Sequence, residues 1–215
     1  MIPDQTDLWN NKHSKGEHSS FDEIPSPFAL VVEEKLSKSS LDILDLGCGV
    51  GRDSLFFSKK GHKVTAVDLS DIVIKENKIR LKSYDIDFMI FDMQDDFSFF
   101  NQKFDLIYSY LALHYFNHET TQKIVNNVHR TLSSNGLFAF ACKSVDDFHY
   151  GNGEEVEKDV FVSKTGHVRH LFSEEYIKEI LSNGWKIEFL DQVDEVYSGQ
   201  KSSIIRCIAR KVQNA

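Results

Sequence analysis

Strand and helix patterns alternate along residues 41–142, and this alternation constrains the fold more than any other feature of the sequence. Five segments are rich in the aromatic and branched residues that suit strands, namely 41–46, 63–67, 87–91, 104–109 and 137–142. Helical periodicity separates them at residues 53–60, 70–83 and 119–133. Repeated strand–helix units predict a parallel sheet with helices on both faces and right-handed crossovers.

The N-terminal segment differs from this pattern. Residues 1–25 form an arm with little periodicity, which carries Trp9 and can fold over a site. A helix then begins at Ser26-Pro27, where a good capping residue precedes a proline in the first turn.

The pattern also breaks after the fifth strand, because residues 144–170 show neither alternation nor helical spacing. Beyond this insertion Ser173 caps a further helix, and two strands are expected at residues 186–190 and 203–209. We therefore expect one domain over residues 1–215.

The composition argues against several classes of function. The 215 residues carry 25 Lys and Arg against 33 Asp and Glu, a net charge of −8, and such a surface repels phosphate backbones. The longest apolar run has six residues, far fewer than the roughly 20 of a membrane-spanning helix. The polar first 20 residues lack a signal-peptide core, and the three cysteines form no Cys-x-x-Cys pair. We expect a cytoplasmic monomer or homodimer without nucleic-acid or membrane partners.

A glycine-rich loop follows the first strand, at the position where open α/β sheets bind ligands. Its glycines are Gly47, Gly49 and Gly51, and this spacing departs from the dinucleotide pattern, which needs a glycine in place of Arg52. Asp45 lies two residues before the first glycine, where its carboxylate would weaken the binding of a pyrophosphate. A ligand with an ammonium and a sulfonium group would be attracted instead.

Two further acids end the next two strands at the same edge of the sheet. Asp68 lies 17 residues beyond Gly51, where a carboxylate can accept hydrogen bonds from both hydroxyls of a ribose. Asp92 follows the third strand and can accept a hydrogen bond from an adenine amino group. The neighbouring Asp95 and Asp96 leave a second interpretation open, in which this acidic cluster is a solvated loop or a cap. Together the acids predict an adenosine-like ligand.

The segments DILDLGCGVGRDSLFF, VTAVDLS, FDMQD and FDLIYSYLALHYF resemble the successive motifs of class I methyltransferases that use S-adenosylmethionine (SAM). The run GCGVGRDSLFFSKKGHKVTAVD is also similar to the small-molecule branch that includes the tellurite-resistance and thiopurine methyltransferases. The resemblance covers residues 41–116. It implies an α/β, doubly wound (Rossmann-like), seven-stranded sheet in the order 3-2-1-4-5-7-6, with strand 7 antiparallel, and a small acceptor such as a thiol or a metalloid oxyanion.

The resemblance also implies roles for individual residues. Asp45 would hold the methionine ammonium, Asp68 the ribose, and Asp92 with Met93 would bracket the adenine. From its sequence context alone, Cys48 is a small apolar filler, since no histidine lies beside it. The cofactor-binding residues implied by the resemblance are Asp45, Gly47, Cys48, Gly49, Gly51, Arg52, Asp68, Leu69, Asp92, Met93 and Ser109.

Methyl transfer from a sulfonium is an in-line displacement, so positioning and exclusion of water can supply most of the acceleration. A general base is needed only for an acceptor that arrives protonated. The catalytic candidates after the fourth strand are Tyr110 and His114, with packing as the alternative for both. This segment lacks the N-P-P-Y or D-P-P-Y motif of amino-methylating DNA enzymes and the Pro-Cys pair of cytosine-carbon enzymes.

The insertion at residues 144–170 is longer than most connections, and we interpret it as an acceptor-binding lid. Residues 151–153 would turn it, residues 160–162 are expected as a short strand, and Arg169 offers a fork for an anionic acceptor. The substrate-binding candidates are Trp9, Tyr115, Tyr150, His167, Arg169 and His170. The alternative is a surface hairpin in which basic groups pair with Glu154, Glu155 and Glu157. A metal site at His167 and His170 is disfavoured, because the segment is not helical and offers no third ligand.

The sequence leaves three functional hypotheses. The first is SAM-dependent methyl transfer to a small-molecule acceptor, driven chiefly by proximity. The second is a non-catalytic SAM-binding protein, either a sensor or a partner subunit. The third, an NAD-dependent oxidoreductase, is disfavoured by Asp45 and by the glycine spacing.

Overall fold

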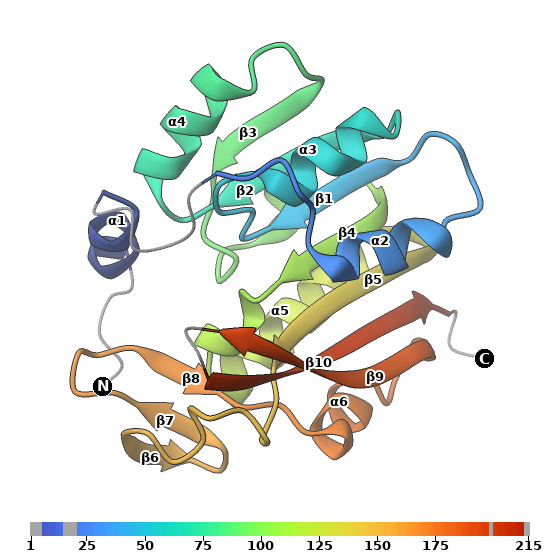
Figure 1. The fold of residues 1–215 in the computed structure, drawn as a ribbon. Coiled ribbons are helices and arrows are strands. Elements are labelled where there is room, and N and C mark those ends of the chain that lie inside the picture. The colour runs from blue at the N-terminus through green and yellow to red at the C-terminus, as the bar shows by residue number, and fades with distance from the viewer. Residues whose placement is uncertain (1–5, 15–20, 198–199, 213–215) are drawn as a thin grey trace.

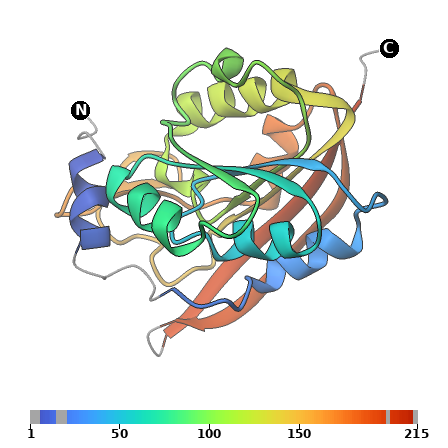
Figure 2. The same cartoon turned by 90° about the horizontal axis from the view of Figure 1, so that it is seen from above.

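The computed structural model describes residues 6–14, 21–197 and 200–212. Seven strands form the central sheet, and helices lie against both of its faces (Figures 1 and 2). The strands are β1 (Asp42–Leu46), β2 (Lys63–Asp68), β3 (Ile86–Ile90), β4 (Phe104–Tyr110), β5 (Leu132–Lys143), β9 (Trp185–Tyr197) and β10 (Gln200–Lys211).

The strand order is β3-β2-β1-β4-β5-β10-β9, which confirms the expected topology. The first five strands pair in parallel, and β10 is antiparallel to both of its neighbours. In the register Asp45 lies beside Ala66 on β2 and Tyr108 on β4. The carboxyl ends of β1 to β5 therefore meet at one edge of the sheet, where the sequence places its acids.

Each face of the sheet is covered by helices that bury an apolar cluster. Helices α2 (Pro27–Glu34), α3 (Arg52–Lys59) and α4 (Asp71–Arg80) cover one face, while α5 (His118–Thr131) and α6 (Glu174–Ile180) cover the other (Figure 2). Phe28 and Phe57 are fully buried on the first side, and Phe138 and Phe172 on the second. Each such ring contributes roughly 1.5–3 kcal/mol on burial.

Local sequence signals explain where α2 begins. Ser26 Oγ accepts a hydrogen bond from Ala29 N at 3.1 Å, and Pro27 occupies the first turn, as expected. Ser26 also donates through its Oγ to Asp53 at 2.8 Å, and Tyr108 donates to the same carboxylate at 2.8 Å. This buried network joins α2 to the start of α3 and to the middle of the sheet.

The structure differs from expectation at the fifth strand and at the C-terminal pair. The expected start at residue 137 was wrong, because Leu132 already pairs with Phe104 and the strand continues through an irregularity at Asn135. The two C-terminal strands are longer than expected because they form one hairpin, paired from Trp185 to Tyr197. Main-chain hydrogen bonds hold such a ladder together without requiring apolar side chains.

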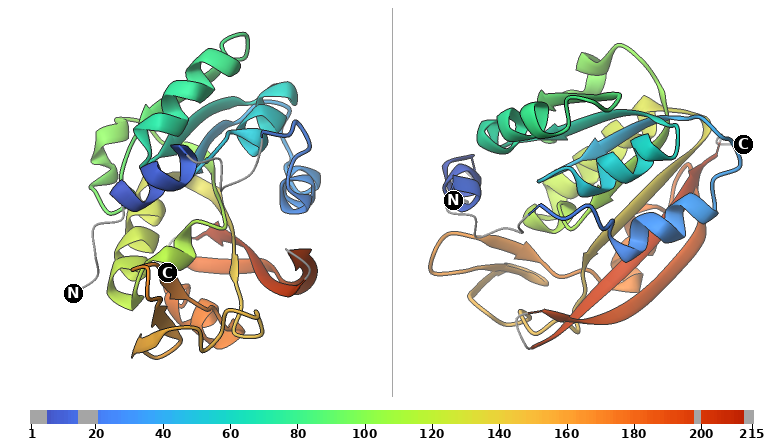
Figure 3. Two further views of the ribbon diagram at one scale, coloured as in Figure 1. Left: turned by 60° about the vertical axis from the view of Figure 1, so that its left-hand side comes forward. Right: turned by 45° about the horizontal axis from the view of Figure 1, so that its top comes forward.

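The N-terminal arm and the insertion both contain regular structure (Figure 3). Part of the arm forms helix α1 (Thr6–Ser14), although little periodicity is visible in its sequence. The insertion contains a three-stranded antiparallel sheet of β6 (Glu154–Glu157), β7 (Val160–Val162) and β8 (Val168–His170), which confirms the expected strand at 160–162. Two short 3₁₀ helices, η1 (Phe97–Phe100) and η2 (Leu113–Tyr115), were not predicted. No helix in the described ranges is long and apolar enough to cross a bilayer.

Candidate active site

The loop between β1 and α3 packs closely on one side and borders open space on another. Gly47 N donates to Val67 O at 2.8 Å, and a Cβ on Gly47 would lie only 2.5 Å from the Cβ of Ala112. Gly51 has a φ of +80° at the N-cap of α3, a conformation that favours glycine. A Cβ on Gly49 would meet no atom within 4 Å. The loop thus leaves room for a ligand beside Gly49.

Asp45 lies beneath this loop and is only 2% exposed. Its Oδ2 accepts one hydrogen bond, from Ser54 Oγ at 2.6 Å. Burial raises the pKa of Asp45 to about 7, and the negative charges of Asp53 and Asp68 raise it further, against the effect of Ser54. A nearby cation favours the ionised form of such a carboxylate, so Asp45 fits an ammonium group.

Asp68 ends β2 and binds the glycine loop directly. Its Oδ2 accepts a hydrogen bond from Gly49 N at 3.0 Å, and its Oδ1 accepts one from Ser70 N at 2.9 Å. Burial raises the pKa of Asp68, while these two N–H groups and the nearby His13 act in the opposite direction. The carboxylate therefore lies at the same open side of the loop as Gly49, in a position to accept ligand hydroxyls.

Helix α1 lies over this edge of the sheet, beside α4 (Figures 1 and 3). Ser70 Oγ donates to Asn10 Oδ1 at 2.8 Å, so α1 touches the segment that follows β2. The Trp9 ring packs edge-on against Tyr115 at 4.6 Å and lies 6.3 Å from the ring of His167. Helix α1 thus bridges the β2 end and the insertion.

Of the two residues after β3 that were expected to bracket an adenine, Met93 borders the glycine loop, whereas the Asp92 carboxylate is bonded within its own loop. Asp92 accepts hydrogen bonds from Gln94 N at 2.9 Å and from Gln94 Nε2 at 3.2 Å, so its carboxylate turns toward its own loop. The Met93 methyl lies 3.3 Å from the Cβ position of Gly47. Asp96 caps η1 by accepting from Ser98 N, which is the cap considered for part of this acidic cluster. Met93 is therefore in a position to contact a ligand at the glycine loop, and Asp92 is not turned toward that loop.

Other expected cofactor-binding residues contact the strands and side chains that surround the glycine loop. Ser109 is fully buried and donates through its Oγ to Leu46 O at 3.0 Å, which ties β4 to the end of β1. Arg52 places its guanidinium 5.5 Å from the Tyr110 ring centre. Burial raises the pKa of the Tyr110 hydroxyl and also that of the Cys48 thiol. Cys48 is therefore a neutral thiol, in line with its expected role as a filler, and Tyr110 remains a neutral phenol.

His114 lies on η2, just beyond β4, and is 1% exposed. Its Nδ1 has no hydrogen-bond partner within the described residues. Burial lowers the pKa of His114 well below its ordinary value, and the positive charges of Lys143, Arg169 and His149 lower it further. His114 is therefore a neutral imidazole, and three basic side chains lie around it.

The residues of the insertion fall into two groups. His167 and Arg169 border α1 and His114, and burial with the charges of Lys12 and Arg169 lowers the pKa of His167 to about 4. The glutamates make other contacts, since Glu157 accepts from Asn117 Nδ2 at 3.0 Å. Within the described part of the chain, no salt bridge joins Glu154, Glu155 or Glu157 to the basic groups, contrary to the surface-hairpin alternative.

Two expected substrate contacts have other neighbours. His170 is 1% exposed, its Nδ1 lies 3.2 Å from Phe116 O, and its ring packs on Tyr176 at 4.4 Å. Tyr150 is 46% exposed, and its hydroxyl donates to Asp159 in the same insertion at 2.9 Å. These contacts favour structural roles for both residues, because they hold the insertion together. The described residues contain no cluster of three metal ligands.

The structure also reveals residues that the sequence patterns did not single out. Asp147 and His149 follow β5, and their side chains are bonded at 2.6 Å between Oδ1 and Nδ1. Lys143 ends β5 and lies 3.5 Å from the same Asp147 carboxylate. The only sequence signal for this group is the string Lys143 to His149 directly after a predicted strand, which does not reveal the contacts.

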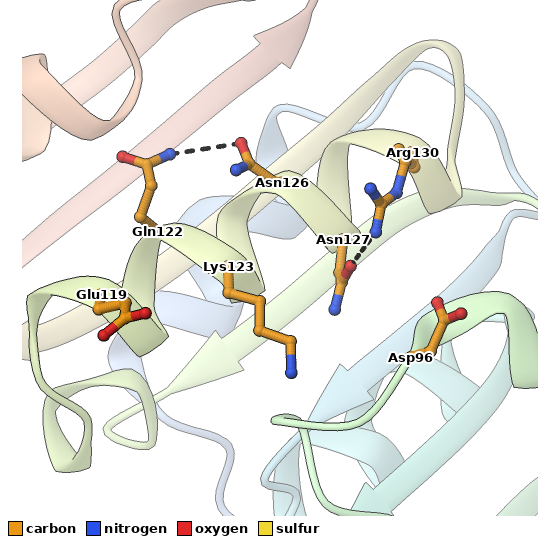
Figure 4. A pocket seen from close by; sticks show the side chains of 7 residues that line it. All are labelled: Asp96, Glu119, Gln122, Lys123, Asn126, Asn127 and Arg130. Carbon is orange, nitrogen blue, oxygen red and sulfur yellow. Dashed lines mark hydrogen bonds between the residues drawn. The ribbon is translucent and has the colours of Figure 1, made fainter.

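A separate hollow lies along α5, against the loop that follows β3 (Figure 4). Lys123 donates to Gln94 O at 2.6 Å and Asn127 to Asp95 O at 3.1 Å, so α5 supports the loop after β3. The lining residues are Asp96, Glu119, Gln122, Lys123, Asn126, Asn127 and Arg130. The hollow is lined by charges of both signs and contains none of the expected site residues.

Comparison with known proteins agrees with the motifs. Residues 43–136 match a family described as a methyltransferase domain. A malonyl-[acyl-carrier protein] O-methyltransferase of Acetivibrio thermocellus is 32% identical over 107 residues, which cover 49% of this chain and 36% of that protein. A protein of the same name from Hamiltonella defensa is 27% identical over 138 residues, covering 64% of this chain and 50% of that protein. The chain therefore spans half or less of these relatives.

Solved structures show the same fold at low sequence identity. The 1,6-didemethyltoxoflavin-N1-methyltransferase of Burkholderia thailandensis, solved with 1,6-didemethyltoxoflavin and S-adenosylhomocysteine, has a TM-score of 0.77 at 20% identity, over 97% of this chain and 87% of that one. TehB from Haemophilus influenzae has a TM-score of 0.66 at 19% identity, over 94% of this chain and 66% of that one. These likenesses confirm the expected Rossmann-like fold.

Proposed function

We propose that this protein is a SAM-dependent methyltransferase of a small-molecule acceptor, because residues 43–136 match a family described as a methyltransferase domain and the sheet has the strand order expected from the motifs. The observation that carries the proposal is the open side of Gly49, whose N–H donates to the half-buried Asp68 carboxylate, with the buried Asp45 beneath the same loop. Two acids at this loop suit a cation that carries a ribose, and a diphosphate would be repelled.

The residues of the donor side have distinct tasks in this proposal. Asp45 holds the ammonium of the methionine part, because the cation restores the charge that burial disfavours. Asp68 accepts the ribose hydroxyls while Gly49 N and Ser70 N fix its orientation. Met93 provides an apolar contact for the adenine next to the glycine loop. Bound SAM supplies an electrophilic methyl group on a cationic sulfur.

The acceptor side uses the residues around η2 and the insertion. His114 packs against Tyr115, and the charge of Arg169 on the insertion acts on His114. Trp9 of α1 contacts Tyr115 and lies close to His167. Three nearby basic groups favour an anionic or electron-rich acceptor. The tellurite-resistance and thiopurine branch, suggested by the sequence, remains part of this proposal. So does methylation of a heteroaromatic nitrogen like that named for the Burkholderia protein.

A labelled-donor assay tests the proposal. The purified full chain is titrated with S-adenosylhomocysteine and then incubated with labelled SAM and a panel of aromatic thiols, phenols, N–H heteroaromatics and metalloid oxyanions. Binding with transfer to one acceptor class supports the methyltransferase. Binding without any transfer supports the alternative, a SAM-binding sensor or partner subunit. Absence of binding contradicts both.

A further inference from the structure

The loop after β5 contains a carboxylate–imidazole pair that the function proposed above does not use. The Asp147 carboxylate is fully buried and accepts four hydrogen bonds. Its Oδ1 accepts from His149 N at 3.0 Å and lies 2.6 Å from His149 Nδ1, and its Oδ2 accepts from Ser202 Oγ at 2.7 Å and from Ser203 N at 3.0 Å. Although burial opposes ionisation, these donors and Lys143 hold the pKa of Asp147 well below its ordinary value. The carboxylate is therefore ionised.

An ionised carboxylate at this distance fixes the proton of the neighbouring imidazole. Because Asp147 can only accept, Nδ1 of His149 must carry the hydrogen, and Nε2 of the neutral ring carries the free lone pair. The His149 side chain is 15% exposed, and its Nε2 has no hydrogen-bond partner in the described part of the chain. An oriented ring with a free basic nitrogen is the arrangement that a general base requires.

The position of the pair in the fold points to the acceptor side. Tyr110 pairs with Ala141 in the sheet, so the ends of β4 and β5 lie side by side. A positive charge on His149 lowers the pKa of His114, which places the two imidazoles near one another. The charged and titratable groups around the pair are Asp146 on the same loop, Lys143 on β5, His114 on η2, Arg169 on β8 and Glu195 on β9.

The two histidines differ in their surroundings. His114 is buried, and burial with three basic neighbours lowers its pKa, so a proton on that ring would be costly. The His149 side chain is 15% exposed, and the Asp147 carboxylate holds its ring through Nδ1 at 2.6 Å. This difference favours His149 as the proton acceptor and leaves His114 as a contact within the site.

We propose that His149 is the general base of the methyl transfer, that Asp147 is its positioning residue, and that the acceptor therefore arrives with a proton on its attacking oxygen or nitrogen. This inference rests on the proposed function. As the acceptor atom forms its bond to the methyl carbon, the carbon–sulfur bond breaks with its electron pair on sulfur, and the acceptor proton goes to Nε2 of His149. The acceptor class is then a phenol or an N–H heteroaromatic, and thiolates and metalloid oxyanions, which need no base, fall outside it.

Nitrogen-15 NMR of the full chain tests the pair without any turnover. The expected result at pH 8 is a neutral His149 ring protonated at Nδ1, assigned by loss of its signal in His149→Gln. A ring protonated at Nε2 would overturn the inference. Asp147→Asn is expected to change the tautomer ratio, but the wild-type spectrum is decisive even if that variant fails to fold.

A pair of acceptors tests the proton transfer itself at pH 8.5, with phenol as the protonated probe and 4-nitrophenol as the ionised one. His149→Gln is expected to lower kcat for phenol by about 100-fold or more, which is the usual contribution of a general base. Its rate with 4-nitrophenol should stay within about threefold of wild type, since no proton is left to remove. Added imidazole should restore part of the phenol rate in His149→Ala.

The controls separate this inference from the proposed function. Lys164→Ala changes an exposed lysine of the same insertion and should leave both rates unchanged. Equal losses with the two phenols in His149→Gln would show a merely structural role and overturn the inference alone. So would wild-type transfer only to thiolates or oxyanions in the wider panel. A wild-type protein that binds no S-adenosylhomocysteine would instead contradict the proposed function.

Discussion

The two halves of the candidate site differ in how their polar groups are held. On the donor side, the ends of β1 and β2, the carboxylates are bonded to the main chain or to a hydroxyl, as the half-buried Asp68 is to Gly49 N and the buried Asp45 is to Ser54. On the acceptor side, the ends of β4 and β5 with the insertion, ring nitrogens of buried or half-buried histidines lack partners, as His114 Nδ1 and His167 Nδ1 do among the described residues.

The halves also differ in charge. Buried carboxylates dominate the donor side, and basic side chains gather on the acceptor side, within a chain whose net charge is −8. This polarity suits a reaction that moves a methyl group from a cationic sulfur to an electron-rich acceptor. The carboxylates of the donor side are thus already held in place by hydrogen bonds. On the acceptor side, ring nitrogens without partners among the described residues are available to bind the molecule that receives the methyl group.

The largest effect is expected for a substitution on the donor side, measured as a loss of affinity for S-adenosylhomocysteine. Asp68→Ala removes the carboxylate that we propose accepts the ribose hydroxyls, and it leaves Gly49 N without its partner. A charge-assisted hydrogen bond contributes about 1.5–3 kcal/mol, so affinity for S-adenosylhomocysteine should fall about 10- to 150-fold. Calorimetry of the variant measures it, with Asp87→Ala, an exposed acid on β3, as the matched control. Unchanged affinity in Asp68→Ala would contradict the assigned role.

The pH dependence of donor binding sharpens the comparison. Below about pH 7 the buried Asp45 is protonated in the free protein, and an ammonium ligand must release that proton. Affinity for S-adenosylhomocysteine should therefore rise about tenfold from pH 6 to pH 8, since one bound proton gives one logarithmic unit per pH unit below the pKa. Asp45→Asn should bind more weakly at pH 8 and should lose this dependence in calorimetric titrations. A variant with the wild-type pH profile would contradict the account.

The same group links pH to folding. The folded pKa of Asp45, about 7, lies above the ordinary value of 3.8, so the folded state binds the proton more tightly than the unfolded state does. The contribution of Asp45 to stability is therefore present at low pH and is lost as pH rises from 3.8 to about 7. Denaturant titrations of the ligand-free protein should show a flatter pH dependence in Asp45→Asn. An equally steep dependence in the variant would place the titration on another group.

A smaller effect is expected on the acceptor side. Arg169→Ala removes a half-buried cation near His114, and the KM for an acceptor that carries a negatively charged substituent should rise about fivefold, the upper range for such a charge pair. Donor affinity should remain at the wild-type value in the same preparation. Steady-state kinetics with the best acceptor of the panel measures the KM, and calorimetry with S-adenosylhomocysteine measures the donor affinity. Equal losses in both would refute a role confined to the acceptor side.

The smallest expected effect lies where α1 joins the two halves. Trp9→Ala removes the edge-on contact with Tyr115, and aromatic pairs contribute about 0.5–1.5 kcal/mol. Because the indole of Trp9 is partly exposed, we expect the lower end, about a two- to threefold loss of affinity for both donor and acceptor. Stopped-flow fluorescence of this tryptophan would follow the helix on ligand binding. A fluorescence signal that does not change when either ligand binds would argue against α1 acting as a lid.

The donor side could be predicted from sequence because its determinants are local. The strand, the glycines and Asp45 follow one another in the chain, and the strand order places Asp68 beside them without any side-chain detail. Asp92 shows the limit of this approach, since its turn back to Gln94 depends on loop geometry that spacing does not specify.

The acceptor side could not be predicted in the same way, because its contacts join residues that are far apart in the chain. Ser202 and Ser203 fix Asp147 from a strand more than fifty residues away, so the role of the pair with His149 is invisible in the local sequence. His170 was expected to be a substrate contact by its proximity to Arg169, yet its place in strand β8 turns it toward Phe116 O instead. Helix α1 was missed because its contacts depend on single residues such as Trp9 rather than on an apolar stripe.

The most direct test of the central claim is a calorimetric titration of the ligand-free full chain, with S-adenosylhomocysteine in one experiment and NADH in another. The account predicts saturable one-to-one heat with S-adenosylhomocysteine and none with NADH, because the half-buried Asp68 is bonded to Gly49 N at the open side of the loop and the buried Asp45 lies beneath it. Heat with NADH and none with S-adenosylhomocysteine would contradict it.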